Sequence, residues 1–225
     1  DRTSRGLGDV YKRQPGTHTM DQSMKDILIG KDPLDIDKRW EELYVGTAMT
    51  GRRGAGVNAI GAIDMALWDI KGKHEEKPVY ELMGGNYHET ITPYASLQPL
   101  GSSFEEYRDS LVEWAERAKN LGFKAVKSEV TMNGPYAHNG MNENDDKHTL
   151  VIESVRKALG SEVKLMVDVQ YKWKTAEDAL RTVKDWGEFD IYFLETPVWT
   201  DNLEDYARMH EEAPMKIAAG EWLTT

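Results

Sequence analysis

Short apolar segments alternate with amphipathic segments through the C-terminal part of the chain, and this alternation restricts the fold more than any other feature. The amphipathic segments have the length of helices, and a Ser-Phe-Glu-Glu capping box at Ser103 opens the first of them. Such a strand–helix rhythm is typical of βαβ units, which place their strands in a parallel sheet. The predicted strands cover residues 91–96, 123–130, 163–169, 191–195 and 216–221.

An eight-stranded TIM-type (β/α) barrel accounts best for this pattern, with only its first five strands present. An incomplete barrel leaves an apolar open edge, which favours aggregation. We therefore interpret the chain as a fragment of a longer protein. A flavodoxin-like five-stranded sheet is the structural alternative, but it leaves the N-terminal helices unexplained.

The N-terminal part predicts helices and a separate domain. Residues 1–20 are expected to be a non-native or disordered leader, since the first fourteen residues have neither helical nor strand periodicity. Residues 21–85 carry apolar residues at helical spacing, for example Ile60, Ile63 and Leu67. We place the domain boundary after Gly84-Gly85, so that residues 86–225 form the truncated barrel.

Composition excludes several classes of function. The chain has 28 Lys and Arg residues against 39 Asp and Glu residues, a net charge of −11, which disfavours binding to nucleic acid or to anionic membranes. No apolar run approaches the roughly 18 residues of a membrane span. The absence of cysteine excludes disulfides, thiolate metal sites and cysteine nucleophiles. We expect a soluble, acidic, cytoplasmic protein.

Three acidic residues end successive predicted strands. Asp168, Glu195 and Glu221 are separated by 27 and 26 residues, one βα unit each. In a parallel barrel this repeat places them side by side at the C-terminal mouth. Clustered carboxylates repel one another unless a cation neutralises them, and oxygen donors favour Mg²⁺ over Zn²⁺. The pattern predicts a magnesium site.

Other polar residues are candidates for proton transfer or substrate binding. Lys127 and Glu129 lie on one face of the second predicted strand, either beside the ion or as an ordinary ion pair. A nearby dication would lower the pKa of Lys127 and make it a base. Gln170 shares a face with Asp168 and hydrogen-bonds either a substrate or its own barrel layer. Arg53 lies in a Gly-rich run that is either an anion clamp or a flexible linker, and His138 lies in a long polar loop that contacts either substrate or only solvent.

Two segments carry a resemblance to a known family. Residues 62–73, Ala-Ile-Asp-Met-Ala-Leu-Trp-Asp-Ile-Lys-Gly-Lys, are followed by Pro78 and by Leu-Met-Gly-Gly at 82–85. Together with the acidic trio, they resemble the mandelate racemase / muconate-lactonizing branch of the enolase superfamily, from about residue 21 to the end. Asp168, Glu195 and Glu221 match the three metal-ligand positions of that family.

The resemblance implies a fold and a reaction. It implies the helical part of an α+β capping domain before a modified TIM barrel, and homo-oligomers at full length. It also implies removal of the proton α to a carboxylate, giving an enediolate that Mg²⁺ stabilises. The Gly-Arg-Arg-Gly run at 51–54 is similar to that of acid-sugar dehydratases, lyases that form 2-keto-3-deoxy acids. A racemase or epimerase, or a non-catalytic homologue or inactive fragment, are the alternatives.

Two positions depart from the family pattern. The second strand usually carries Lys-x-Lys, but here the second lysine position is Glu129. The base on this side is therefore Glu129, a repositioned Lys127, or absent. Gln170 replaces an asparagine common at the third strand. The resemblance places the other acid/base group, a His–Asp dyad, beyond Thr225.

Overall fold

The computed structural model describes residues 17–51 and 53–223, which form two compact units. Residues 17–89 belong to the first unit and residues 90–222 to the second. Most of the expected leader, residues 1–16, lies outside the described residues. None of the described helices has both the length and the apolar character that crossing a bilayer requires.

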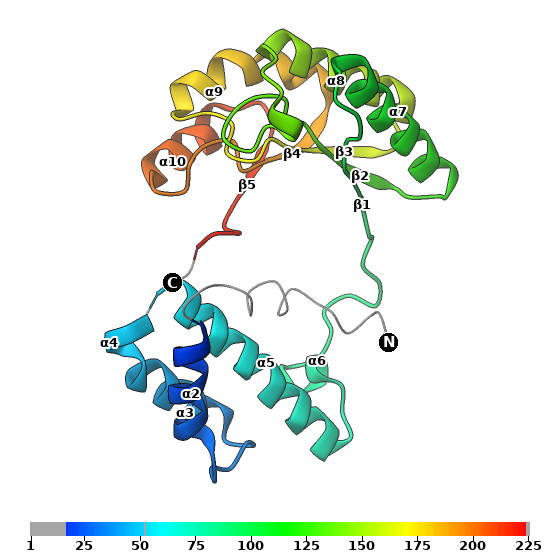
Figure 1. Cartoon of the computed structure of the whole chain (residues 1–225). Helices are drawn as coiled ribbons and strands as arrows, with labels where there is room; N and C mark the ends of the chain where they lie inside the picture. Colours follow the sequence, from blue (N-terminus) through cyan, green and yellow to red (C-terminus); the bar gives the residue numbers. More distant parts are fainter. Residues whose placement is uncertain (1–16, 52, 224–225) are drawn as a thin grey trace. The chain divides into compact units, whose positions relative to one another are not determined.

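The first unit is helical, as expected from its periodicity (Figure 1). Its small core consists of Met24, Leu43 and Ile60, one from each of the three longest helices. The longest helix includes Gly72, where a Cβ atom would lie only 2.8 Å from the carbonyl oxygen of Lys77. The helices are α2 (Thr17–Leu28), α3 (Ile36–Gly46), α4 (Ala48–Gly51), α5 (Ala55–Glu75) and α6 (Val79–Leu82).

The second unit is a five-stranded parallel sheet whose strands pair in sequence order. Sequential order is that of a (β/α) barrel and excludes the flavodoxin-like alternative, in which strand 1 lies between strands 2 and 3. The predicted partial barrel is therefore confirmed. The strands are β1 (Ala95–Leu97), β2 (Ala125–Glu129), β3 (Lys164–Asp168), β4 (Ile191–Glu195) and β5 (Lys216–Ala218).

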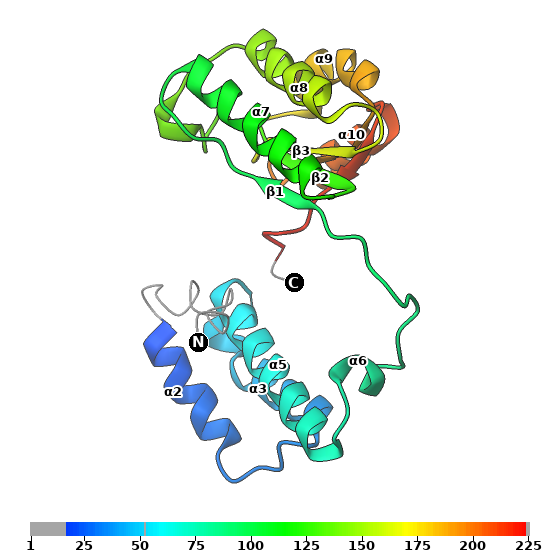
Figure 2. The same ribbon diagram turned by 90° about the vertical axis from the view of Figure 1, so that its right-hand side faces the viewer.

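Helices cover one face of this sheet (Figures 1 and 2). The core between sheet and helices contains alternate strand residues such as Val126, Val167 and Leu194, all fully buried. The residues between them, including Lys127 and Asp168, point to the opposite face, as the period of a strand requires. The connecting helices are α7 (Phe104–Asn120), η1 (His138–Gly140), α8 (Asp145–Leu159), α9 (Ala176–Val183), η2 (Asp185–Phe189) and α10 (Leu203–Glu212).

The two edge strands are shorter than the sequence predicts. Strand β1 begins at Ala95 rather than at residue 91, and β5 ends at Ala218 rather than at residue 221. Within the described residues each pairs with one neighbour only, β1 with β2 and β5 with β4. The apolar character of residues before Ala95, such as Ile91 at 85% exposure, therefore does not produce pairing.

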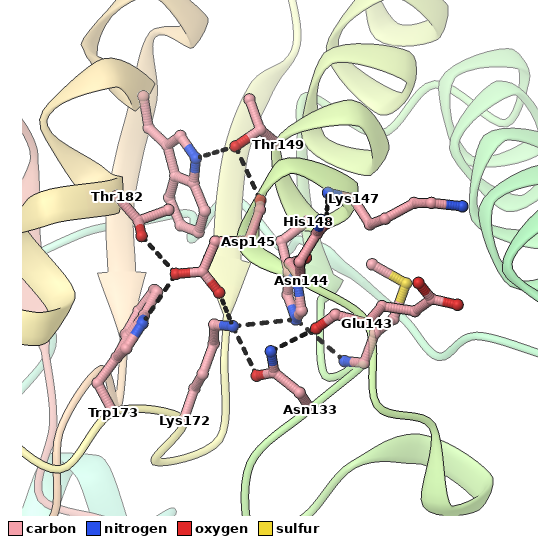
Figure 3. A network of polar contacts seen from close by, with 12 residues as sticks. Asn133, Glu143, Asn144, Asp145, Lys147, His148, Thr149, Lys172, Trp173 and Thr182 are labelled. Atoms are coloured by element: carbon pink, nitrogen blue, oxygen red, sulfur yellow. Dashed lines mark hydrogen bonds and ion pairs between the residues drawn. The ribbon is translucent and has the colours of Figure 1, made fainter.

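A buried polar network fixes the loops that follow β2 and β3 (Figure 3). The Lys172 ammonium, whose side chain is 1% exposed, lies 2.6 Å from Asp145 Oδ1 and donates to Asn133 Oδ1 at 2.6 Å. Asp145 Oδ2 also accepts hydrogen bonds from Trp173 Nε1 and from the Thr182 hydroxyl. The network thus joins the start of α8 to both loops and to α9.

His148 completes the network as a neutral side chain. Its Nε2 accepts a hydrogen bond from the Met132 amide at 3.2 Å and lies 3.4 Å from Lys172 Nζ, while Nδ1 faces the carbonyl of Asn144 at 2.9 Å. Two donors face Nε2, so the proton belongs on Nδ1. Burial, followed by the charge of Lys172, lowers the pKa of His148 to about 4.

This arrangement predicts a loss of stability in mild acid. Because the folded-state pKa of His148 is below the ordinary 6.5, the unfolded chain binds more protons between about pH 6.5 and 4. The free energy of unfolding should therefore fall across this window as pH falls, by up to about 3 kcal/mol. Urea titrations at pH 7.5, 5.5 and 4.5 measure the fall.

His148→Gln keeps a hydrogen-bond acceptor without a titrating ring, so it should flatten this pH dependence. His88→Gln, at an exposed histidine, serves as the control and should retain it. Equal pH dependence in the two variants would contradict the assignment to His148. The pKa of Asp145 is lowered to about 2, although burial opposes the effect of its hydrogen bonds, so its contribution to stability is fully present above about pH 3.8 and is lost only below that pH.

Candidate active site at the ends of the strands

The parallel register brings three predicted residues to one edge of the sheet. Glu129 on β2 is paired with Asp168 on β3, and Asp168 with Glu195 on β4. Parallel strands present their C-terminal ends at the same edge, so the three carboxylates are neighbours. A register shift in β4 between the partners of Leu165 and Val167 is needed to bring Glu195 level with Asp168.

Lys127 lies between two of these carboxylates. Its Nζ donates to Glu195 Oε2 at 2.7 Å and lies 3.6 Å from Asp168 Oδ2. Burial alone lowers the pKa of Lys127, but the hydrogen bond and charge of Glu195 and the charge of Asp168 outweigh it and raise the pKa overall. Lys127 is therefore an ammonium that neutralises part of the charge of the pair.

Asp168 is held by groups from two strand ends. Its Oδ1 accepts from the Thr196 hydroxyl and from the Gln170 amide, both at 3.0 Å. Positive φ angles, between 44° and 58°, occur at Gln170, Tyr171 and Thr196. Residues other than glycine rarely adopt this backbone region. Such strain concentrates at functional sites, where the surrounding structure holds it.

Hydrogen bonds from neutral side chains, rather than an ion pair with a lysine, hold the carboxylate of Glu129. Its carboxylate accepts from Gln98 Nε2 at 2.9 Å and from the Thr131 hydroxyl at 3.1 Å. The Tyr107 hydroxyl of α7 donates to the carbonyl of Glu129 and so anchors the end of β2. Burial, followed by the charge of Asp168, raises the pKa of Glu129, although Thr131 and nearby cations oppose the rise.

Glu221 is not level with the other two predicted ligands. In the β4–β5 ladder the residue opposite Glu195 is Ala218, so Glu221 follows three residues later, on a turn, with an exposed side chain. Three residues of extended chain span about 10 Å. Across the parts of the chain that are described, no three His, Cys, Asp or Glu side chains gather as a metal ligand set.

Tyr171 links the turn of Glu221 to the carboxylate pair. It is 3% exposed, and in the described structure its hydroxyl oxygen is enclosed without a hydrogen-bond partner. Burial comes first, with the charges of Glu221, Asp168 and Glu195 adding to it, in raising the pKa of Tyr171. All three predicted ligands therefore act on one phenol, although they do not share one ligand sphere.

The remaining predicted residues lie in different surroundings. Gln170 is half-buried, and its backbone rather than its side chain contacts Asp168. His138 Nε2 lies 3.0 Å from the carbonyl of Gly101, and its ring contacts the edge of Tyr107 at 5.4 Å between centroids. Arg53 belongs to the first unit, where its side chain is exposed.

Sequence reasoning missed Thr196, Gln98 and Tyr171. Thr196 had a usable signal, since it directly follows a predicted ligand at a strand end. Gln98 had none, because its contact with Glu129 joins residues 31 apart in the chain. The buried Lys172 network was also missed, although a lysine between Tyr171 and Trp173 is an unusual pattern in an acidic chain.

The donors present suit a hard divalent cation in kind. Asp168 and Glu195 offer adjacent carboxylate oxygens, the sequence has no cysteine, and no cluster of histidines occurs among the described residues. Oxygen donors of this type are those that Mg²⁺ prefers in proteins. In number the pair falls short of a ligand set, and Glu221 supplies a third donor only if its turn moves toward the pair.

Comparison with known proteins places these features in a family. Residues 110–225 match the model of the enolase C-terminal domain-like family, and residues 5–84 match the N-terminal domain of mandelate racemase / muconate lactonizing enzyme. The C-terminal match lies within the range of the sequence resemblance, whereas the N-terminal match begins at residue 5 and so includes part of the expected leader, which the resemblance leaves out.

Three similar proteins illustrate the range of relatives. D-galactarolactone cycloisomerase of Agrobacterium fabrum is 34% identical over 86% of this chain and 48% of its own length. Arabinonate dehydratase of Saccharolobus solfataricus is 31% identical over 90% of this chain and 51% of its own length. A racemase of Streptomyces coelicolor, solved with bound magnesium, has a TM-score of 0.79 at 29% identity and covers 98% of this chain and 60% of its own.

The chain thus spans about half the length of the curated relatives that it matches. Those relatives include cycloisomerases, dehydratases and racemases, so similarity to them does not single out one reaction for this chain. The two matched domains, the sequential parallel strands and the acidic residues at their ends agree in their assignment. The chain belongs to the mandelate racemase / muconate lactonizing enzyme family of the enolase superfamily.

Proposed function

We propose that this chain is part of a Mg²⁺-dependent lyase that removes the proton α to a carboxylate and dehydrates an acid sugar to a 2-keto-3-deoxy acid. The observation that carries the proposal is the adjacency of Asp168 and Glu195 at the strand ends, with Lys127 Nζ within 3.6 Å of both. Relatives named as dehydratases of sugar acids support the substrate class.

Asp168, Glu195 and Glu221 are the proposed metal ligands. A bound divalent cation would stabilise the negative charge that develops on the substrate carboxylate when the α-proton leaves. Thr196 and the Gln170 amide keep Asp168 oriented, which is the role of outer-shell partners in metal sites. Glu221 would join the pair through a movement of the turn after β5, where Gly220 has a φ of 114°.

Lys127 and Glu129 are the proposed proton-handling residues. Both lie on the open face of β2 beside the carboxylate pair, and the raised pKa of Glu129 suits a carboxyl that exchanges a proton. The Gln98 and Thr131 hydrogen bonds orient it. Arg53, His138 and Gln170 are the proposed substrate contacts.

A cycloisomerase is a second candidate, since the relative that shares 34% identity acts on a lactone. The two reactions differ in substrate, because a dehydratase removes water from an open-chain sugar acid, whereas a cycloisomerase opens a ring with no loss or gain of water. A full-length protein that contains this chain, given an acyclic sugar acid with Mg²⁺, should release a 2-keto-3-deoxy acid, detected by its semicarbazone absorbance. Formation of the keto acid from a lactone, with which it is isomeric, but not from the acyclic acid would instead establish the cycloisomerase.

Magnesium binding can be tested on the chain itself. Mg²⁺ at a hundredfold excess over its Kd should stabilise the folded state by about 2.7 kcal/mol, because a ligand that binds only the folded state shifts unfolding by mass action. Asp168→Asn, Glu195→Gln and Glu221→Gln should each reduce the shift in melting temperature. Glu153→Gln, at an exposed position on α8, is the control. An unchanged shift in all three ligand variants would refute the proposed site.

Replacement of Lys127 separates charge compensation from metal binding. In EDTA, Lys127→Met should lower the free energy of unfolding by about 2 kcal/mol, since two half-buried carboxylates lose their counter-charge. Mg²⁺ should then stabilise the variant more than the parent, because no ammonium competes for the pair. Lys73→Met breaks an exposed pair with Asp69, and should cost under about 0.5 kcal/mol. A smaller Mg²⁺ effect in Lys127→Met than in the parent would contradict the competition.

A further inference from the structure

Four aromatic side chains gather beside the carboxylate pair, where the loops after β2 to β5 meet. Tyr171 is stacked on Trp222 at 4.0 Å between ring centroids, and Trp199 contacts both, at 5.6 and 5.5 Å. Tyr136 from the loop after β2 stacks on Trp199 at 6.3 Å. We call Tyr136, Tyr171, Trp199 and Trp222 the aromatic cluster.

The cluster remains open to ligand. Tyr136, Trp199 and Trp222 are 43%, 38% and 37% exposed, whereas Tyr171 is buried beneath them. Tyr171 and Trp199 also line a cavity of about 590 Å³ with Gly134, Pro135, Trp173, Lys172 and Lys174. Its volume is within the range of small-molecule sites, and its lining is mainly apolar and aromatic, as is usual for them.

The charges around the cavity differ from those of the acidic chain as a whole. Lys174 is exposed at the cavity, and Lys172 lines its wall. The ammonium of Lys172 is already matched by Asp145, so Lys174 is the cation available to an anionic ligand. An aromatic wall with one cation at its edge complements a molecule with a flat apolar face and a single negative charge.

We propose that the aromatic cluster and this cavity bind the ring of a cyclic sugar acid, with Trp199 against the ring and Lys174 near the carboxylate. The proposal rests on the proposed function in taking the substrate to be an acid sugar, and of the two candidate reactions it favours the cycloisomerase, whose substrate is a ring. A sugar ring presents a C–H face that packs on an aromatic ring, whereas an open-chain sugar acid exposes hydroxyls all around and gains less from such a surface. The site therefore selects ring forms over open chains.

Tyr171 connects this subsite with the proposed chemistry. Its ring forms part of the cavity wall. Burial raises the pKa of its phenol, and the charges of Glu221, Asp168 and Glu195 raise it further. A buried hydroxyl without a partner is costly unless a ligand or a water supplies one. A ligand oxygen admitted when Trp222 shifts would satisfy the phenol at the junction of cavity and carboxylates.

Two ligands of equal charge provide the test. D-galacturonate is a ring at pH 8, and L-galactonate, in which its hemiacetal carbon is reduced to an alcohol, is its open-chain counterpart with the same configuration, so the pair differs mainly in the ring. Isothermal titration of the chain in EDTA at pH 8 should give a Kd for galacturonate at least about fivefold lower than for galactonate. The metal is absent, so the result does not depend on the proposed metal site.

Variants assign the preference to the cluster. Trp199→Ala should raise the Kd of galacturonate by about five- to tenfold with little change for galactonate, and Trp199→Phe, which keeps a ring, should restore most of the affinity. Lys174→Met should weaken both ligands. Trp40→Ala, at an exposed tryptophan of the first unit, is the matched control. Thermal melting shows which variants are folded.

Several outcomes would overturn the proposal. These are equal affinity for the two ligands, tighter binding of galactonate, no detectable binding of galacturonate, or a folded Trp199→Ala variant with unchanged affinity. If Mg²⁺ fails to stabilise the chain while galacturonate binds as described, the metal proposal fails and the ring subsite stands. The reverse result rejects the ring subsite alone.

Discussion

The parallel register of β2, β3 and β4 is the constraint on which the candidate site depends. Backbone pairing, not side-chain attraction, places Glu129 opposite Asp168 and Asp168 opposite Glu195. Three adjacent carboxylates would repel one another, so the sheet must overcome their repulsion. The Lys127 ammonium and the hydrogen bonds to Asp168 and Glu129 reduce that cost, and the helix-facing core on the other side of the strands supplies the stability.

The loops beyond the strands extend this order. Pairing continues past the end of β3, where the amides of Tyr171 and Trp173 donate to the carbonyls of Thr196 and Pro197. The contacts of Lys172 with Asp145 and Asn133 hold the same loop a second time. A loop tied on both sides can keep Gln170 and Tyr171 in a strained backbone conformation. The aromatic cluster therefore rests on a rigid support.

Much of the fold followed from the sequence, because strand–helix alternation and parallel pairing are local patterns with one dominant solution. The adjacency of Asp168 and Glu195 followed as well. The position of Glu221 did not, because equal spacing along the chain does not guarantee equal register. Strand β4 contains a register shift, and β5 stops at Ala218, so a separation of 26 residues places Glu221 beyond the ladder. Contacts such as Gln98 with Glu129 depend on loop paths that no local pattern encodes.

The two cations near the sheet edge show how burial decides the role of a lysine. Lys172 is enclosed, lies within 2.6 Å of Asp145 and Asn133, and acts as a fixed structural charge. Lys127 keeps 14% of its side chain exposed and shares two carboxylates at unequal distances, so a competing cation can displace it at lower cost. Breaking a fully buried ion pair costs much free energy, because one charge is left without a partner or water. A pair with access to solvent costs less to break, because water compensates the separated charges. Lys127, which neutralises Asp168 and Glu195, is therefore also the cation that a metal ion can replace at this pair.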